Sequence, residues 1–268
     1  MKMSQIFPES CYTFKALSRS EVVKACESNL TVTGHVEKIL ADTQELLVTF
    51  GNNLIAYLPF SEVSIYDYEY SKNPNRPLPI NVCILLGKNI RTKVVEVTDN
   101  RITLSRKKNM EEAYQYLTTC TSCMFHVTSL SVFNAFGDIG DGITARLNIR
   151  EVSRARIRNI GEAIRKGDTM RVILLDYDHT KRFRVSYKQT YKEFSQNDFF
   201  EGMAVRGVVN EPVNKTYKSF FVTLSHQISG ILEVNSWAPE LRYGDVVDCA
   251  VSKVTEKGVT LTFLKLIE

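Results

Sequence analysis

Two phenylalanines, Phe133 and Phe136, stand three residues apart in the segment VFNAFGDIGDGI, which spans residues 132–143. Side chains of a β-strand alternate between its two faces, so residues i and i+3 point to opposite sides unless a bulge lies between them. Either one ring faces solvent while the other belongs to the core, or both rings lie outside the core. A ring outside a core can stack on another planar ring, and this is the chemistry that the spacing offers.

Basic residues gather just after this segment. Between Arg146 and Arg171 there are eight basic and three acidic residues, a local excess of five positive charges in a chain whose net charge is +4. The positive charge therefore belongs to one region. The eight residues are Arg146, Arg150, Arg154, Arg156, Arg158, Arg165, Lys166 and Arg171. Aromatic rings beside a basic region fit a site for single-stranded nucleic acid, because every base offers a π-face and phosphates attract cations.

Catalytic patterns do not emerge from the sequence. The four histidines are scattered and form no constellation with a nucleophile or a base. They are His35, His126, His179 and His226. No P-loop or HExxH pattern occurs, and GDIGDG opens no helix; its Asp-Gly pair instead predicts a hairpin turn with positive backbone angles. We therefore expect no enzymatic activity and no cofactor.

Cysteine usage indicates neither a disulfide framework nor a metal site. Six cysteines in 268 residues are too sparse for a disulfide scaffold. Cys120 and Cys123 form a CxxC pair followed by His126, which invites a metal interpretation. A structural zinc ion needs four ligands and no second pair follows, so small residues at the start of a strand are the preferred interpretation.

Composition places the chain among soluble globular proteins. Hydrophobic residues make up 44% of the sequence, and no apolar run reaches the roughly 18 residues of a membrane span. The first residues, MKMSQIFPESCYTF, lack the charged start, apolar run and cleavage site of a secretory signal. These features predict a cytoplasmic protein with no membrane contact, and we expect a monomer.

Three segments repeat the same order of features. Each contains an early glycine-bearing strand, a pair of strands, an irregular connection, a strand opened by Gly-Lys or Gly-Asp, and a closing hairpin strand. The fourth strands begin in LLGKNI, RKGDTM and LRYGDVV. Five short antiparallel strands in about 70 residues remove their open edges by closing into a barrel. The predicted fold is mainly β, with three tandem five-stranded OB-fold barrels.

Short helices are predicted between these barrels. Apolar residues at helical spacing follow the closing strands at Ser105–Leu117 and Ser186–Phe200, and an earlier helix begins at Ser18 or Ser20. The expected division is 1–30 for an N-terminal extension with a helix, 31–117 and 118–197 for two barrels with their linkers, and 198–268 for the third barrel. A Pro-rich insertion at 64–80 carries Tyr66, Tyr68 and Tyr70, which we expect to pack against their own barrel; a partner surface is the alternative.

The second repeat resembles the S1 class of OB-fold RNA-binding domains. The resemblance rests on FNAFGDIGDGI, NIREVS, RKGDTMRVILLDYD and RFRVS, in this order and spacing. All three repeats fit over roughly residues 31–268, although only the second is specific. The arrangement is similar to the three-repeat S1-like proteins of Gram-positive anaerobes.

The resemblance implies an RNA-binding site on the second barrel. Phe133 and Phe136 would stack on bases from one outer face, with Asn134 bending the strand where the family has glycine. Asn148 stands at the position of the family's histidine, and Asp178 and Arg182 at its hairpin pair, in which Arg182 would contact phosphate and Asp178 would orient it or bind a ribose hydroxyl. Nearby basic candidates are Arg146, Arg154, Lys181 and Arg184, each of which is about as well explained as a solvated surface charge.

The other two repeats depart from this pattern. In the first, Gln44 and Leu47 occupy the aromatic positions and Pro59 the histidine position, so only Arg101 of the hairpin pair remains. In the third, Lys218 and Phe221 occupy the aromatic positions. Glu233 lies near the histidine position and Gly258 replaces the hairpin arginine. Stacking is expected to be weaker in the third barrel and absent from the first, which leaves these barrels as spacers or protein-docking surfaces.

The sequence thus leaves two hypotheses. The first is a non-enzymatic protein that binds single-stranded RNA through its central barrel, in translation or ribosome-associated mRNA handling. The second is an adaptor whose degenerate barrels dock on a ribosome, polymerase or nuclease. Exposed rings at Phe133 and Phe136 favour the first, whereas rings packed under the connection at 154–160 favour the second. Single-stranded DNA remains a third possible ligand, since stacking and phosphate contacts do not distinguish the sugars.

Overall fold

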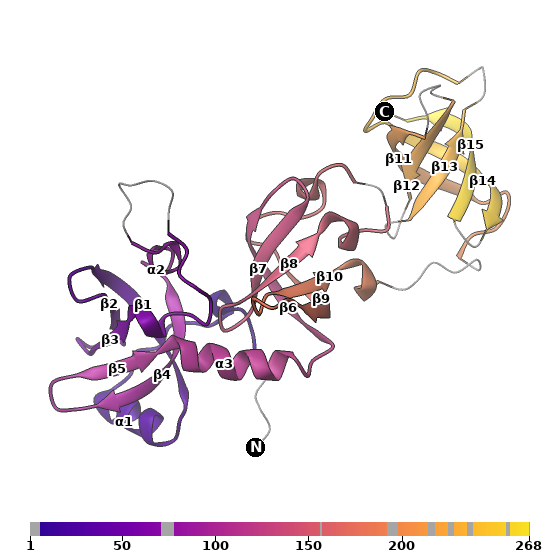
Figure 1. Cartoon of the computed structure of the whole chain (residues 1–268). Coiled ribbons are helices and arrows are strands. Elements are labelled where there is room, and N and C mark those ends of the chain that lie inside the picture. Colours follow the sequence, from indigo (N-terminus) through magenta and orange to yellow (C-terminus); the bar gives the residue numbers. More distant parts are fainter. Residues whose placement is uncertain are drawn as a thin grey trace. The chain divides into compact units, whose positions relative to one another are not determined.

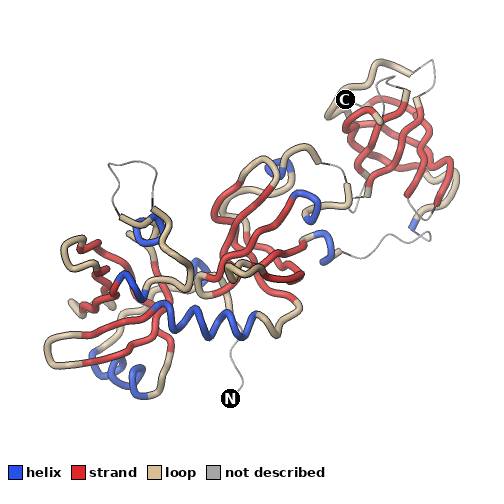
Figure 2. The backbone as a smooth tube through the Cα atoms, in the orientation of Figure 1, coloured by secondary structure: helices blue, strands red, loops and turns tan. Residues whose placement is uncertain are grey.

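The structure is a computed structural model of the whole chain (Figure 1). It describes residues 6–70, 78–155, 157–191, 198–213, 218–224, 228–234, 238–255 and 258–267. Three closed five-stranded barrels follow one another along the chain, and strands dominate it (Figure 2). This confirms the predicted fold class. No helix within the described ranges is both long and apolar enough to cross a membrane.

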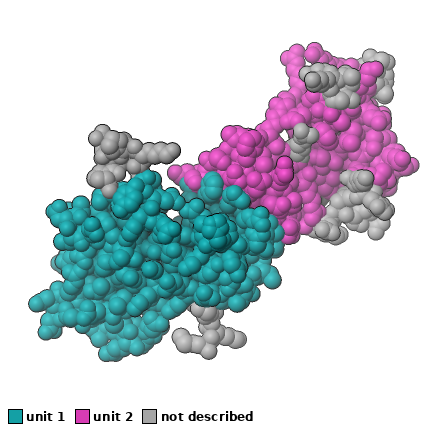
Figure 3. Space-filling view, in the orientation of Figure 1, with its two compact units in different colours: residues 1–128, 136–146, 167–184 teal, residues 129–135, 147–166, 185–268 magenta. Residues whose placement is uncertain are grey.

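The chain divides into two compact units, drawn in different colours in Figure 3. Unit 1 comprises Met1–Thr128, Phe136–Arg146 and Gly167–Arg184, and unit 2 comprises Ser129–Ala135, Leu147–Lys166 and Val185–Glu268. The first barrel lies wholly in unit 1 and the third wholly in unit 2. Strands of the second barrel contribute to both units.

The first barrel has the strand order β1-β2-β3-β5-β4. Its strands are β1 (Thr31–Leu40), β2 (Glu45–Thr49), β3 (Ile55–Pro59), β4 (Asn89–Val97) and β5 (Ile102–Ser105). Alternate residues of β2, such as Leu46 and Val48, are fully buried, as the period of a strand with one core face requires. Gly34 of β1 lies so close to Val48 that a Cβ atom there would be 2.4 Å from a methyl group, so the barrel interior needs glycine at this position.

Three α-helices lie among the described residues of unit 1. They are α1 (Arg19–Glu27), α2 (Ile80–Cys83) and α3 (Arg106–Leu117). Ser18 caps α1 and forms a capping box with Glu21, which confirms the predicted front helix and selects Ser18 over Ser20. Ser105 caps α3 by accepting a hydrogen bond from the backbone N–H of Lys108, as predicted for the helix after the first barrel.

The second barrel has the order β10-β8-β7-β6-β9. Its strands are β6 (Ser122–Leu130), β7 (Asn134–Gly140), β8 (Ile143–Asn148), β9 (Thr169–Tyr177) and β10 (Phe183–Ser186). Asp141 and Gly142 connect β7 to β8 with φ angles of 47° and 83°. Positive φ at both central residues is typical of a type I′ hairpin turn, as the Asp-Gly pair predicts.

The third barrel has the order β11-β12-β13-β15-β14. Its strands are β11 (Ala204–Pro212), β12 (Ser219–Thr223), β13 (Ser229–Glu233), β14 (Val246–Thr255) and β15 (Gly258–Leu266). The helix predicted at Ser186–Phe200 is replaced, over its described residues, by the 3-10 turn η5 at Lys188–Thr190. Residues 192–197 lie outside the described residues. The described residues also form the 3-10 turns η1 (Glu9–Cys11), η2 (Phe60–Glu62), η3 (Ile149–Glu151) and η4 (Ile160–Glu162).

A buried ionic network joins the N-terminal segment, α3 and the β7–β8 hairpin inside unit 1. The buried guanidinium of Arg106 donates to both carboxylate oxygens of Glu9, at 2.9 and 2.7 Å. The carboxylate of Asp138 accepts hydrogen bonds from the backbone N–H groups of Glu9, Gly140 and Gly142, at 2.7, 2.8 and 3.1 Å. Burial of these charges requires such partners. The network therefore fixes the hairpin of the second barrel against elements of the first.

Candidate nucleic-acid interface

Both phenylalanine rings are exposed. The side chain of Phe133 is 58% exposed and that of Phe136 is 42% exposed. Residues of β7 alternate regularly from Asn134 onward: Ala135 and Ile139 are buried, and Phe136 lies on the outer face. Neither ring belongs to the core, so the alternative that placed Phe136 in the core is wrong.

The irregularity that exposes Phe133 lies before β7 rather than within it. Ser131 closes a short turn in which its backbone N–H and hydroxyl both donate to the carbonyl of Asn134, at 2.8 and 3.1 Å. Asn134 has no positive φ angle. The bend that exposes Phe133 is therefore the turn at 131–134, which ends at Asn134 and carries Phe133 out of the strand register.

Asn148 ends β8 and caps η3. Its side-chain Nδ2 donates to Oδ1 of Asn134 at 3.0 Å, and its Oδ1 accepts from the backbone N–H of Arg150 at 3.1 Å. The next backbone N–H, of Ile149, donates to the carbonyl of Phe133 at 2.8 Å. Asn148 therefore supports the segment that carries Phe133, and only part of its amide is left for a ligand.

The β9–β10 hairpin of unit 1 presents Arg182 from a tight turn. Oδ1 of Asp178 accepts from the hydroxyl and the backbone N–H of Thr180, at 2.5 and 2.8 Å, and from the backbone N–H of Arg182 at 3.1 Å. The hydrogen bond from the Thr180 hydroxyl holds the pKa of Asp178 below its usual value. Lys181 takes a φ of 62° at the tip. Asp178 thus shapes the turn through the backbone.

The cations of this hairpin have partners inside unit 1. Arg182 forms an ion pair with Glu69, Nη2 to Oε1 2.6 Å. Arg184 binds the carboxylate of Asp176 with two N–H groups, Nε to Oδ1 2.5 Å. Lys181 lies 6.0 Å from the ring centre of Tyr114. All three cations stay largely exposed, so solvent screens these pairs.

The remaining basic candidates of the second barrel differ in exposure. Arg146 is exposed on the outer face of β8, in unit 1, where its charge adds to the hydrogen bond from Arg184 that chiefly lowers the pKa of Asp176. Arg154 is half-buried in unit 2 and donates to the backbone carbonyl of Tyr191 at 3.5 Å. Arg158 pairs with Glu211 at 3.1 Å and lies 4.0 Å above the Tyr243 ring of the third barrel. The basic region of the sequence is thus partly used for internal contacts, and Arg156 lies outside the described residues.

The first and third barrels place their candidate residues differently. Arg101 forms an ion pair with Glu45 and lies 4.5 Å above the ring of Tyr57. Phe221 is half-buried in β12, opposite Ile231, and Lys218 is exposed just before that strand. These residues thus lie on barrels other than the one that carries Phe133 and Phe136.

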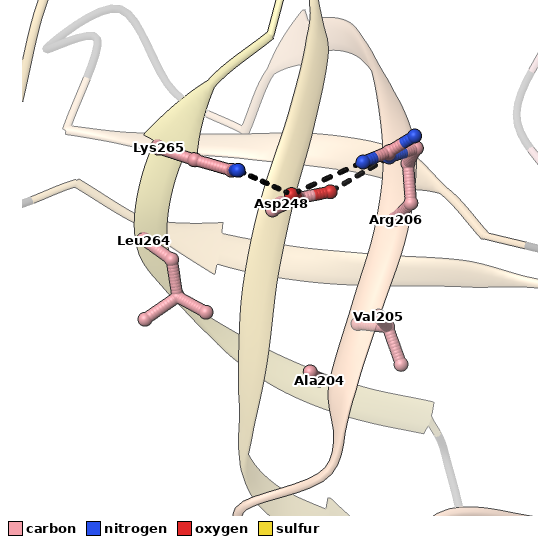
Figure 4. Close-up of a pocket in the computed structure, with 6 residues that line it drawn as sticks. All are labelled: Ala204, Val205, Arg206, Asp248, Leu264 and Lys265. Atoms are coloured by element: carbon pink, nitrogen blue, oxygen red, sulfur yellow. Dashed lines mark hydrogen bonds and ion pairs between the residues drawn. The ribbon is translucent and has the colours of Figure 1, made fainter.

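The third barrel carries a charged hollow that the sequence did not predict. Figure 4 shows Asp248 of β14 between Arg206 of β11 and Lys265 of β15, with Nε of Arg206 2.7 Å and Nζ of Lys265 3.5 Å from the carboxylate. Ala204, Val205 and Leu264 line the rest of the hollow. The three charges come from positions 206, 248 and 265 on three different strands, so no linear motif could reveal them.

The insertion between β3 and β4 of the first barrel reaches the second barrel, which was not expected. The hydroxyl of Tyr66 bonds to the second barrel: it accepts from the backbone N–H of Thr144 on β8 at 2.8 Å and donates to the carbonyl of Lys181 at 3.5 Å. Tyr68 and Tyr70 are 42% and 61% exposed and contact each other edge to face. Residues 71–77 of the insertion lie outside the described residues.

Within the described ranges, no three or more histidine, cysteine, aspartate or glutamate side chains come together as a possible metal site. Cys123 points into the barrel from β6, and burial raises the pKa of its thiol to about 12. A protonated, buried thiol is a poor metal ligand. The side chain instead fills core space near the start of the strand.

A family model matches the second barrel, and individual relatives match longer stretches of the chain. Residues 126–188 match the family model described as S1 RNA binding domain. The small ribosomal subunit protein bS1c of Spinacia oleracea is 31% identical over 151 residues, which cover 56% of this chain and 33% of that protein. The small ribosomal subunit protein bS1 of Leuconostoc lactis is 27% identical over 204 residues, covering 68% of this chain and 47% of that protein.

A second kind of relative shares a shorter region. The polyribonucleotide nucleotidyltransferase of Rhodopirellula baltica is 30% identical over 128 residues, covering 42% of this chain and 17% of that protein. The chain spans less than half the length of each of these three relatives. The match to the S1 RNA binding domain therefore falls on the second of three closed five-stranded barrels.

Proposed function

We propose that the chain binds single-stranded RNA without catalysing a reaction, chiefly through the outer face of its second barrel. The observation that carries this proposal is the exposure of two phenylalanine rings, Phe133 and Phe136, within the residues that match the S1 RNA binding domain. Leaving a large aromatic side chain in water forgoes the stabilising free energy that its burial would contribute. Two such rings on one short segment therefore serve a ligand.

Chain connectivity keeps the two rings within reach of one oligonucleotide. Cα atoms three residues apart lie within about 11 Å of each other, since each step spans at most 3.8 Å. Stacking of a base on an aromatic ring contributes about 1–3 kcal/mol and tolerates any base. Phe133 and Phe136 would take neighbouring bases, while Arg146, Arg182 and Arg184 contribute cations for the phosphates.

The hydrogen bonds of the two polar residues refine their proposed roles. Asn148 positions the segment of Phe133 through Asn134 and offers one remaining N–H to a base or sugar. Asp178 acts by holding the backbone of Arg182 in the hairpin turn. Arg154, Lys181, Arg101, Lys218 and Phe221 are secondary contacts in this proposal, each on the periphery or on another barrel.

The biological setting follows from the relatives. Two of them are named small ribosomal subunit proteins, which supports a role near the ribosome, in translation or mRNA handling. We propose a cytoplasmic monomer that meets RNA in that setting. An adaptor function is a second candidate, because the first barrel exposes apolar side chains around α2: Ile80, Ile84 and Leu86 are 40%, 52% and 50% exposed.

The direct test is fluorescence anisotropy of a labelled single-stranded RNA of about 12 nucleotides across a salt series. Neutralised phosphates release counterions, so the logarithm of the affinity should fall linearly with the logarithm of the salt concentration. Single-stranded DNA of the same sequence and double-stranded RNA serve as competitors, and weaker competition by the duplex is expected. Binding that did not weaken with salt, or no binding at all, would overturn the proposed function and favour the adaptor.

A further inference from the structure

The insertion of the first barrel reaches onto the hairpin that carries Arg182. We define the strap as residues 64–70, IYDYEY preceded by Ser64. Its first tyrosine, Tyr66, is held between the backbone N–H of Thr144 and the carbonyl of Lys181. At its far end the carbonyl of Glu69 accepts from the backbone N–H of Ile80, at 2.6 Å. Both ends are thus anchored, and both anchors lie in unit 1.

Between the anchors the strap presents an acid and a ring to one cation. The Glu69 carboxylate binds Arg182 at 2.6 Å, and the Arg182 guanidinium lies 5.7 Å from the centre of the Tyr66 ring. A guanidinium pairs with a carboxylate or a phosphate by the same geometry, and it stacks on an aromatic ring or a base by the same attraction. The strap therefore offers Arg182 an anion and an aromatic ring, which are the two kinds of partner that RNA would offer.

We propose that the strap is an intramolecular competitor of RNA at Arg182, and that this competition is a function of the first barrel. The inference rests on the proposed function of the second barrel and deepens it. RNA must exchange the Glu69 carboxylate for a phosphate before Arg182 contributes to binding. The first barrel, in which Gln44 and Leu47 stand at the aromatic positions of the S1 pattern, then sets the affinity and salt response of its neighbour.

Exposure makes this exchange reversible. The side chains of Arg182 and Glu69 are 49% and 60% exposed. Exposed ion pairs contribute little to stability because solvent screens them and two long side chains lose freedom. The strap consequently lowers the affinity for RNA and does not abolish it. Tyr68 and Tyr70 flank Glu69 in the chain and contact each other edge to face, which leaves the carboxylate as the competing group.

The test compares Glu69→Gln with the wild-type chain in the anisotropy assay. Glutamine keeps the size of the side chain and removes its charge. The dissociation constant should fall about 2- to 5-fold, the range that corresponds to one exposed ion pair. The salt dependence should also steepen by about 0.7 in logarithmic slope, because one further phosphate contact then releases a counterion from the RNA without an opposing carboxylate.

Two variants isolate the pair from general charge effects. Asp67→Asn makes the same change of charge two residues away, and Asp67 has no hydrogen bond or ion pair to any residue that the structure describes. Its RNA affinity should stay within about 1.5-fold of the wild type, because a solvated charge outside the pair is screened. In Glu69→Gln combined with Arg182→Gln, the affinity should equal that of Arg182→Gln alone.

The outcomes separate this inference from the proposed function. If wild-type protein binds RNA and Glu69→Gln binds no better, or if Asp67→Asn gains as much as Glu69→Gln, the strap does not compete at Arg182. A gain that persists in the double variant would also overturn the inference. If neither the wild type nor Glu69→Gln binds RNA, the proposed function itself fails, and the inference fails with it.

Discussion

The side-chain amide of Asn148 donates to the side-chain oxygen of Asn134 across 3.0 Å, which ties the end of β8 to the start of β7. In the S1 pattern that the sequence resembles, glycine stands at the position of Asn134 and histidine at that of Asn148. Here the two asparagine side chains contact each other. The pair lies directly beside the turn that exposes Phe133, whose carbonyl accepts from Ile149 next to Asn148. The two departures from the pattern thus form one local structure that supports the ring.

Replacing Asn148 by alanine should therefore loosen this corner. The variant loses the hydrogen bond to Asn134 and the cap on Arg150, and we expect a loss of about 1–2 kcal/mol in the free energy of unfolding. Urea denaturation provides the measurement. Asn159→Ala is the matched control, since Asn159 caps η4 through one hydrogen bond from the backbone N–H of Gly161. A loss no larger than that of the control would show that the Asn134 contact adds nothing.

The turn between β7 and β8 should tolerate no side chain at Gly142. Its φ is +83°, and a Cβ atom would lie 1.8 Å from Nη2 of Arg106, which is bound to Glu9. Gly167 offers the matched control, because its φ is +95° and a Cβ atom there would meet nothing within 4 Å. Gly142→Ala should cost about 1–3 kcal/mol more than Gly167→Ala, because it adds overpacking to the same backbone strain. Equal melting temperatures for the two variants would contradict the tight packing against Arg106.

Stability should fall as pH rises toward neutrality. Burial and, after it, the charge of Glu9 raise the pKa of Asp138 to about 7, against the backbone N–H groups of Glu9 and Gly140 and the charge of Arg106. The pKa of Asp141 nearby is also raised by burial, although Arg91 opposes this. The folded chain thus keeps protons that the unfolded chain releases above about pH 4. The stabilising effect is complete below the unfolded pKa and is lost as pH passes the folded value.

Thermal unfolding between pH 5 and 8 measures this linkage. The expected slope is at most about 1.4 kcal/mol per pH unit for each proton. Asp138→Asn should flatten the slope. Asp178→Asn should leave it unchanged, because the pKa of Asp178 is lowered and its titration is complete below this range. A wild-type melting temperature that rises from pH 5 to 8 would contradict the protonated, buried state of Asp138.

Repeating features of the sequence were enough to predict three barrels, since strand alternation, Gly-Asp starts and turn residues are local signals. The Asp141-Gly142 turn and the Ser18 cap were predictable for the same reason. The packing of Tyr66 was not, because its partners Thr144 and Lys181 are 78 and 115 residues away in the chain. The sequence left the exposure of Phe136 as one of two alternatives, and the burial pattern of β7 decides between them.

Prediction of the site from the sequence had the same limit. Asn148, Asp178 and Arg182 were identified from the family pattern, but that pattern gives residue types without partners. The Glu69 carboxylate on Arg182 comes from an insertion that the pattern does not contain. The prediction of an α-helix at Ser186–Phe200 was wrong for its described residues, which include a 3-10 turn. Apolar residues at this spacing also suit a segment that packs after such a turn.

The central claim is that the two exposed rings bind RNA, and one comparison tests it most directly. Anisotropy of a labelled single-stranded RNA of about 12 nucleotides is measured with the wild type and with Phe133→Ala combined with Phe136→Ala. Phe200→Ala is the control, because Phe200 is 67% exposed and lies outside the S1 match. We predict a loss of about 2–4 kcal/mol for the double variant and none for the control. Equal affinity of the double variant and the wild type would contradict the claim.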